Sequence, residues 1–222
     1  MEVRCSVVQV TKDYMEWYAL LSLIYSYDTA LTLLEKGEEP DWQSAKLDLG
    51  LEVTEALLPE DGRKRAVINQ YFGKGLDGQY IKEQIEHKYP EYSHQMSVIG
   101  KTACFSESYD MMPKVRQVGL AISMKTRKLN QNYTRFANNW LYVFAPSLFT
   151  QDNIHAVCQI CQENNQAYAI QFDKVFLNVN DKVFVVSITG TVEQILDLED
   201  FLARLKKEAQ EKASNKKIFI NN

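Results

Sequence analysis

Several residue types are scarce in this chain of 222 residues, and each scarcity excludes a class of protein. The four cysteines, Cys5, Cys104, Cys158 and Cys161, are too few for a secreted disulfide scaffold. Their scatter predicts reduced thiols and a cytoplasmic protein. The three histidines argue against a metal centre built from several imidazoles, so acid-base chemistry would have to come mainly from carboxylates and lysines.

The chain also lacks a charge excess and a long apolar run. The 25 basic and 29 acidic residues leave a net charge of -4, which argues against a surface that binds polyanions everywhere but allows a local basic groove. The most apolar stretch, residues 15–34, is interrupted by polar residues, so we expect a core helix and no membrane span. Residues 1–4 do not resemble the start of a signal peptide.

What is present is the composition of a globular protein, 45% hydrophobic and 24% charged. A chain of this length buries roughly 70% of its unfolded surface. We expect a single α/β domain over residues 1–222, with a core at about 12–58 and 112–190. A helical insertion at about 59–111 and an amphipathic C-terminal helix at about 191–213 complete the expected organisation.

Hydrophobic periodicity predicts a central mixed sheet flanked by helices. Residues 47–54 alternate leucine or valine with polar residues and glycine, which is the pattern of a strand. The expected helices cover residues 12–36, 61–72, 78–88, 113–130 and 152–164. Further strands are expected at 140–145, 174–178 and 182–188. Cys158 and Cys161 form one C-x-x-C, which we interpret as part of a buried helix face and not as a zinc site.

One constellation could carry chemistry: Pro40-Asp41, ten intervening residues, then Glu52-Val53-Thr54. Glu52 and Thr54 leave the same face of the predicted strand. Asp41 is far enough before the strand for the chain to bend back and bring it beside Glu52. Two carboxylates held close together repel unless a cation lies between them, and oxygen ligands suit Mg²⁺ or Mn²⁺.

This constellation resembles the PD-(D/E)xK nuclease superfamily. The stretch Ile122-x-x-Lys125-x-x-Lys128, with Tyr133 after it, is similar to the segment that comes after the motif in such proteins. The resemblance implies a restriction-endonuclease-like core, in which a helix, a strand hairpin that carries the two acids, and a crossover helix come before further strands. It also implies an Mg²⁺- or Mn²⁺-dependent endonuclease that hydrolyses phosphodiester bonds. It also implies that Asp41 and Glu52 are metal ligands. It favours DNA over RNA as the substrate, and a homodimer is one option because many nucleases that cut both strands are dimers.

The sequence departs from the family pattern at Thr54, which stands where the family has a lysine. Some members supply that lysine from the following helix. Lys125 continues the apolar stripe of the helix predicted at 113–130, so its stem should point inward, and Lys128 lies one turn further on. An inward lysine is costly unless a carboxylate meets it. We therefore predict Lys125 as the third catalytic residue.

Further candidates are weaker. Glu16 matches the acid that the superfamily often contributes from its first helix, although an acid near a helix start is also favoured by the helix dipole. Asp48 shares a strand face with Glu52 and could replace Asp41. Basic residues could follow a phosphate backbone, although charge clusters are usually solvated surface. These basic candidates are Arg63, Lys64, Arg65, Arg127, Lys128 and Arg135.

Two other functions stay open. The chain could be a catalytically inactive nuclease-fold protein that binds nucleic acid or a protein partner, with Thr54 marking a lost site. It could also be an unrelated α/β regulator whose 12 tyrosines form an interface. Convergence of Asp41, Glu52 and Lys125 would favour the enzyme, and dispersed side chains would favour a binding protein.

Overall fold

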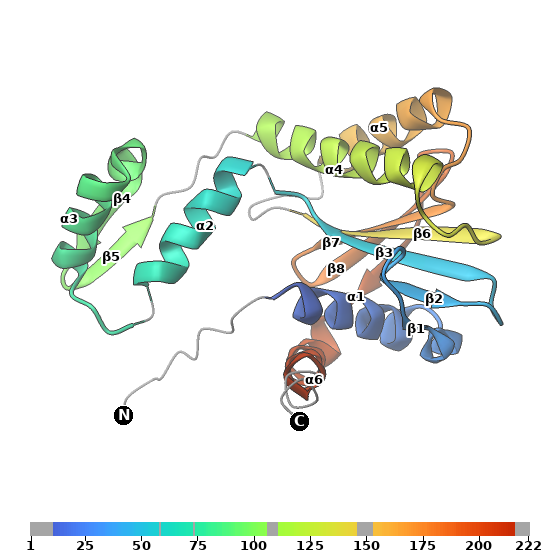
Figure 1. Cartoon of the computed structure of the whole chain (residues 1–222), viewed down its shortest axis with the longest axis horizontal. Helices are drawn as coiled ribbons and strands as arrows, with labels where there is room; N and C mark the ends of the chain where they lie inside the picture. The colour runs from blue at the N-terminus through green and yellow to red at the C-terminus, as the bar shows by residue number, and fades with distance from the viewer. Residues whose placement is uncertain (1–10, 58, 73, 106–110, 146–152, 216–222) are drawn as a thin grey trace. The chain divides into compact units, whose positions relative to one another are not determined.

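The computed structural model describes residues 11–57, 59–72, 74–105, 111–145 and 153–215 (Figure 1). These residues fall into two compact units. The larger unit holds those between 11 and 56 and from 111 onward, and the smaller unit holds those between 57 and 105. Within the described part of the chain, no helix is long and apolar enough to cross a membrane.

The larger unit is built on a mixed sheet of seven strands in the order β1-β2-β3-β6-β7-β8-β9. The strands are β1 (Glu35–Lys36), β2 (Trp42–Ser44), β3 (Leu49–Glu55), β6 (Asn138–Phe144), β7 (Lys174–Val179), β8 (Lys182–Ser187) and β9 (Val192–Asp197). β3, β6 and β7 are parallel neighbours, and the remaining pairs are antiparallel. The α/β class and the mixed central sheet agree with the sequence-based prediction.

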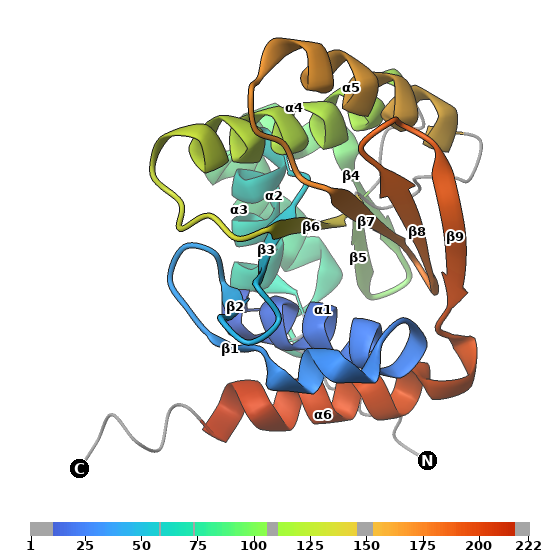
Figure 2. The same cartoon turned by 90° about the vertical axis from the view of Figure 1, so that its right-hand side faces the viewer.

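Helices cover both faces of this sheet. Helices α1 (Lys12–Ser26) and α6 (Leu202–Asn215) lie on one face, and α4 (Met111–Gln131) and α5 (Ile154–Ala167) lie on the other (Figure 2). Each layer has its own apolar cluster. Between β3 and its parallel neighbour β6, the chain runs through the smaller unit and then α4. Because α1 and α4 lie on opposite faces of the sheet, side chains of β3 point towards one helix or the other (Figure 2).

Alternation along β3 divides its side chains between the two layers. Leu49, Leu51 and Val53 are buried in the cluster beneath α1, and Leu51 has no exposed surface. Glu52 lies between them in sequence and therefore points to the opposite, α4 side of the sheet. The prediction of a buried strand here is confirmed. The inward stripe predicted for α4 is also confirmed, because Val118 and the other apolar members are buried.

Two predicted helix boundaries are wrong. The helix expected to reach Lys36 ends at Ser26, and a 3₁₀ turn, η1 (Thr29–Leu33), leads into β1. The turn begins where the Asp28 carboxylate accepts a hydrogen bond from Ala30 N (2.8 Å). A side chain that caps the next element competes with continuation of the helix.

The C-terminal helix expected from about residue 191 begins at Leu202, after a short 3₁₀ turn, η4 (Glu199–Phe201). The preceding residues form the edge strand β9, because a turn at Gly190 (φ 73°) reverses the chain beside β8. Backbone pairing with the edge of β8 therefore outweighed the helical pattern of these residues.

The smaller unit contains more than the helices expected for an insertion. Helices α2 (Pro59–Tyr71) and α3 (Gly78–Lys88) are followed by a 3₁₀ turn, η2 (Pro90–Gln95). The hairpin of β4 (Met96–Ile99) and β5 (Thr102–Phe105) comes next. The hairpin turns at Gly100, whose φ of 63° suits glycine. A buried cluster around Ile85 forms its own small core.

Candidate functional site

Asp41 is held against the middle of β3. It precedes β2, and its backbone carbonyl accepts a hydrogen bond from Gly37 N at 2.9 Å. Its side-chain Oδ2 accepts a hydrogen bond from the backbone N of Val53 at 2.8 Å. The next residue, Trp42, donates from Nε1 to the carbonyl of Glu16 (3.1 Å), which ties this segment to α1. The Asp41 carboxylate is thus fixed beside Glu52 with only 2% of the residue exposed.

Glu52 meets Lys125 and Tyr133 on the α4 side of the sheet. The Tyr133 hydroxyl donates to Glu52 Oε1 at 2.8 Å, and the Lys125 ammonium contacts the same oxygen. Lys125 Nζ also lies 3.4 Å from the Tyr133 hydroxyl. Glu52 is 3% exposed, and its second oxygen, Oε2, is buried without a hydrogen-bond partner among the residues that the structure describes. This unmet oxygen is the clearest sign of a missing ligand.

Glu16 brings a third buried carboxylate to the same region from α1. It is 2% exposed, and Lys36 contacts its Oε2. Lys12 Nζ lies 3.2 Å from Glu16 Oε1 and 3.2 Å from Asp41 Oδ1, so one ammonium joins the two acids. The Lys12 side chain is itself 74% exposed. A largely exposed lysine side chain therefore joins two buried carboxylates.

The charges in this cluster act on one another. Burial raises the pKa of the Glu52 carboxyl, and the negative charge of Asp41 raises it further, while Lys125 and Tyr133 oppose both effects. Burial also raises the pKa of Tyr133, with the Glu52 charge adding to it, so the phenol stays protonated at neutral pH. The negative charges of Asp41 and Glu52 therefore repel each other when both carboxyls are ionised.

The cluster has the donors of a magnesium or manganese site but is closed by lysines. Across the described residues, no three or more His, Cys, Asp or Glu side chains are grouped as ligands of one metal ion. Glu52 Oε2 nevertheless accepts no hydrogen bond from any described residue, and Asp41 Oδ1 is held by the solvent-exposed side chain of Lys12. Oxygen donors of this kind suit a hard divalent cation. The residues therefore fit such an ion if the Lys12 ammonium moves away.

The other predicted site residues lie around this cluster or apart from it. Asp48 is exposed in the turn before β3, with φ of 46°, and its Oδ1 accepts from Ala137 N at 2.9 Å. Four residues of strand, about 13 Å, separate it from Glu52, so it serves the turn. Thr54 is half-buried in β3, two residues beyond Glu52, and Lys128 is exposed one turn beyond Lys125.

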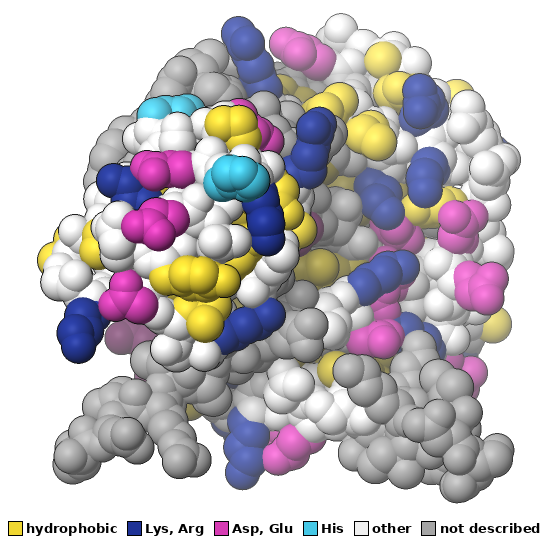
Figure 3. Space-filling view, turned by 60° about the vertical axis from the view of Figure 1, so that its left-hand side comes forward, with side chains coloured by type: hydrophobic (Ala, Val, Ile, Leu, Met, Phe, Trp, Pro, Cys, Tyr) yellow, Lys and Arg dark blue, Asp and Glu magenta, His cyan; other side chains and the backbone are white. Residues whose placement is uncertain are grey.

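The predicted phosphate-binding residues are divided between the two units. Arg63 is exposed in the smaller unit, and Arg127 and Arg135 are exposed in the larger one. The side chains of Lys64 and Arg65 lie outside what the structure describes. On the face shown in Figure 3, Lys and Arg side chains are interspersed with Asp and Glu side chains.

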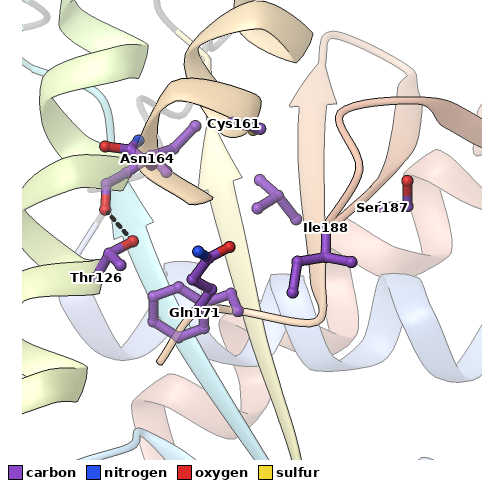
Figure 4. Close-up of a pocket in the computed structure, with 9 residues that line it drawn as sticks. Thr126, Cys161, Asn164, Gln171, Ser187 and Ile188 are labelled. Carbon is purple, nitrogen blue, oxygen red and sulfur yellow. Dashed lines mark hydrogen bonds between the residues drawn. The ribbon is translucent and has the colours of Figure 1, made fainter. Parts of the chain in front are cut away.

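A separate cavity lies between α4, α5 and the β8 end of the sheet (Figure 4). Its polar lining includes Thr126, Asn164 and Ser187, and its volume of about 10 Å³ holds about one water molecule. Cys161 lines this cavity from α5, and Cys158 is buried on the same helix, which confirms that the C-x-x-C is part of a buried helix face. Burial raises the pKa of Cys161 to about 12. None of the lining residues belongs to the carboxylate cluster. Cys5 lies outside the described residues.

Sequence reasoning did not find two of the lysines, Lys12 and Lys36, and it left Tyr133 without a role. The spacing of Lys12 and Glu16, four residues apart on one helix, was an available signal. The contacts of Lys36 and Tyr133 depend on the packing of distant segments and leave no such signal. None of the family models, curated proteins or solved structures compared with this chain matches it.

Proposed function

We propose that this chain is a metal-dependent nuclease with a restriction-endonuclease-like core, and that it hydrolyses phosphodiester bonds in DNA. Asp41 and Glu52 are the proposed ligands of Mg²⁺ or Mn²⁺, and Lys125 is the proposed catalytic lysine. The observation that carries the proposal is the convergence of these three side chains, which come from the residue before β2, from β3 and from α4.

The order of elements also supports this assignment. A helix, a strand pair that carries the two acids, a crossover helix and a parallel strand follow one another as α1, β2–β3, α4 and β6. This is the order that the family resemblance implies for the core of a PD-(D/E)xK nuclease. Glu16 on α1 occupies the place where that resemblance implies a further acid.

Charge and burial give the physical reason for a cation. Glu16, Asp41 and Glu52 are each almost fully buried, and a buried carboxylate is stable only when it is paired or bound to a metal. Glu52 Oε1 is held by Lys125 and Tyr133, and Asp41 Oδ2 is held by the backbone of Val53. Glu52 Oε2, together with Asp41 Oδ1 once Lys12 has left it, would therefore bind the metal ion. When bound there, the ion would supply an activated water and neutralise charge on the scissile phosphate.

Lys125 supplies the positive charge that Thr54, at the position of the family's lysine, cannot supply. Its side chain is 20% exposed, so the ammonium reaches both Glu52 and the solvent side of the site. In that position it can orient the attacking water or bind a phosphate oxygen. Lys12, once displaced from the acids, offers a second ammonium to the DNA backbone. We place the enzyme in the cytoplasm because the described cysteines are free thiols. We also propose a homodimer, because two active sites would let the enzyme cut both DNA strands.

Cleavage assays test the proposal directly. Supercoiled plasmid and end-labelled oligonucleotides are incubated with purified protein and Mg²⁺ or Mn²⁺, with and without EDTA. We expect cleavage by the wild type and its loss in Glu52→Ala and Lys125→Met. Asp48→Asn is the matched control, because it removes an acid before the same strand and asparagine tolerates the positive φ. DNA binding without cleavage, unchanged by Glu52→Ala, would instead support an inactive nuclease-fold protein.

A further inference from the structure

The Tyr133 hydroxyl stands at the centre of the Glu52 contacts. Tyr133 follows the end of α4, is 7% exposed, and packs with the apolar cluster on that side of the sheet. Its hydroxyl lies 2.8 Å from Glu52 Oε1 and 3.4 Å from Lys125 Nζ. The tyrosine therefore touches both the proposed metal ligand and the proposed catalytic lysine without being either.

The two donors share one oxygen of the carboxylate. Tyr133 and Lys125 both reach Glu52 Oε1, while Oε2 is buried and accepts no hydrogen bond within the described residues. A carboxylate held at one oxygen cannot turn about its last bond without breaking both contacts. The unmet oxygen is therefore kept on the side away from Tyr133.

Resting on the proposed nuclease site, we infer that Tyr133 is a positioning residue that fixes the Glu52 carboxylate so that Oε2 is presented to the metal ion. A tyrosine suits this task better than the lysine beside it. Its ring is rigid and packed, whereas a lysine ammonium ends a flexible four-carbon stem that also has to serve the substrate. Partners that orient a metal ligand in this way typically account for 10–100-fold of metal affinity.

Calorimetric titration with Mn²⁺ tests this role in the full-length chain without added nucleic acid. Tyr133→Phe keeps the ring and removes only the donor. Tyr142→Phe is the matched control, because Tyr142 is a fully buried tyrosine of β6 whose hydroxyl accepts from Ser22 Oγ (3.1 Å) on the opposite side of the sheet. Circular dichroism melts of the metal-free proteins set a temperature at which both variants are folded.

We expect Tyr133→Phe to bind Mn²⁺ about 10–100-fold more weakly than the wild type, and Tyr142→Phe to bind like the wild type. Plasmid cleavage by Tyr133→Phe should recover towards the wild-type rate as Mn²⁺ is raised to saturation. If the wild type binds Mn²⁺ and Tyr133→Phe binds it equally well, the inference is overturned while the proposed function stands. Cleavage that stays lost at saturating Mn²⁺ also overturns it, since the hydroxyl would then act in the chemistry. A wild type that does not bind Mn²⁺ overturns the proposed function itself.

Discussion

Replacement of Lys125 by methionine isolates the charge that faces Glu52. Methionine retains most of the apolar stem and deletes the ammonium, so the packing of α4 against the sheet is largely kept. Glu52 then retains only the Tyr133 hydroxyl on Oε1, with Asp41 still close by. The variant therefore leaves a buried carboxylate without its cation.

The expected cost follows from the burial of the pair. Removing one partner of a buried ion pair typically costs about 3–5 kcal/mol. The Lys125 side chain is 20% exposed, so some of its attraction to Glu52 is already screened by water. We take the lower end, about 3 kcal/mol. For a protein of this size that corresponds to a fall of about 6–12 °C in melting temperature.

The cost should depend on pH in a defined direction. In the wild type, burial already raises the folded-state pKa of Glu52 above its unfolded value, and Lys125 lowers it. Without Lys125 the folded pKa rises further. A carboxyl with a raised folded pKa contributes stability below its unfolded pKa and loses it as pH rises through the folded pKa. The deficit of Lys125→Met should therefore be small at acidic pH and grow as pH rises through the raised Glu52 pKa.

Thermal melts followed by circular dichroism, without metal and at several pH values, measure this deficit. Lys128→Met is the matched control, since Lys128 is exposed on the same helix one turn further on. We expect it to change stability by less than about 0.5 kcal/mol. An equal deficit for Lys125→Met at all pH values, or none at neutral pH, would refute the assignment of Lys125 as the counter-ion of buried Glu52.

Three further outcomes are expected. Lys12→Gln should bind Mn²⁺ more tightly than the wild type in calorimetry, because the ammonium no longer competes for Glu16 and Asp41, and weaker binding would contradict this. Leu51→Asp should leave no cooperative thermal transition, because a charge without a partner would be buried in the centre of the sheet. A melting temperature like that of the wild type would disprove the assignment of Leu51 to the buried face of β3. Cys161 should resist thiol reagents at neutral pH, since burial raises its pKa to about 12, and rapid labelling of the folded protein would argue against that burial.

The elements best predicted from the sequence are those whose burial follows a local period. The alternation through Leu51 predicts β3 to within about two residues, and the stripe through Val118 predicts α4. The range predicted for α3 agrees with the structure, Gly78–Lys88, where the Asp77 carboxylate accepts a hydrogen bond from Gln79 N at the first turn. In each case the order of apolar and polar residues within the segment is enough to determine which face of the helix or strand is buried.

Residues 192–197 show where local pattern stops being sufficient. Their sequence is compatible with a helix, and most of their side chains remain exposed in the strand that they form. They form β9 because β8 presents unpaired backbone groups beside the turn at Gly190. The pairing with β8 depends on the tertiary structure, and the pattern of apolar residues within 192–197 does not predict it.

The candidate site divides in the same way. The spacing of Asp41 and Glu52 and the inward stripe that contains Lys125 were sufficient, with the family resemblance, to nominate these residues from the sequence. Only the tertiary structure decided that Tyr133 contacts Glu52 across 81 residues of sequence, and that Lys12 joins Glu16 to Asp41. The reason is physical: a strand's period determines which face a carboxylate leaves from, whereas the packing of α1 and α4 on opposite faces of the sheet determines which groups it meets there.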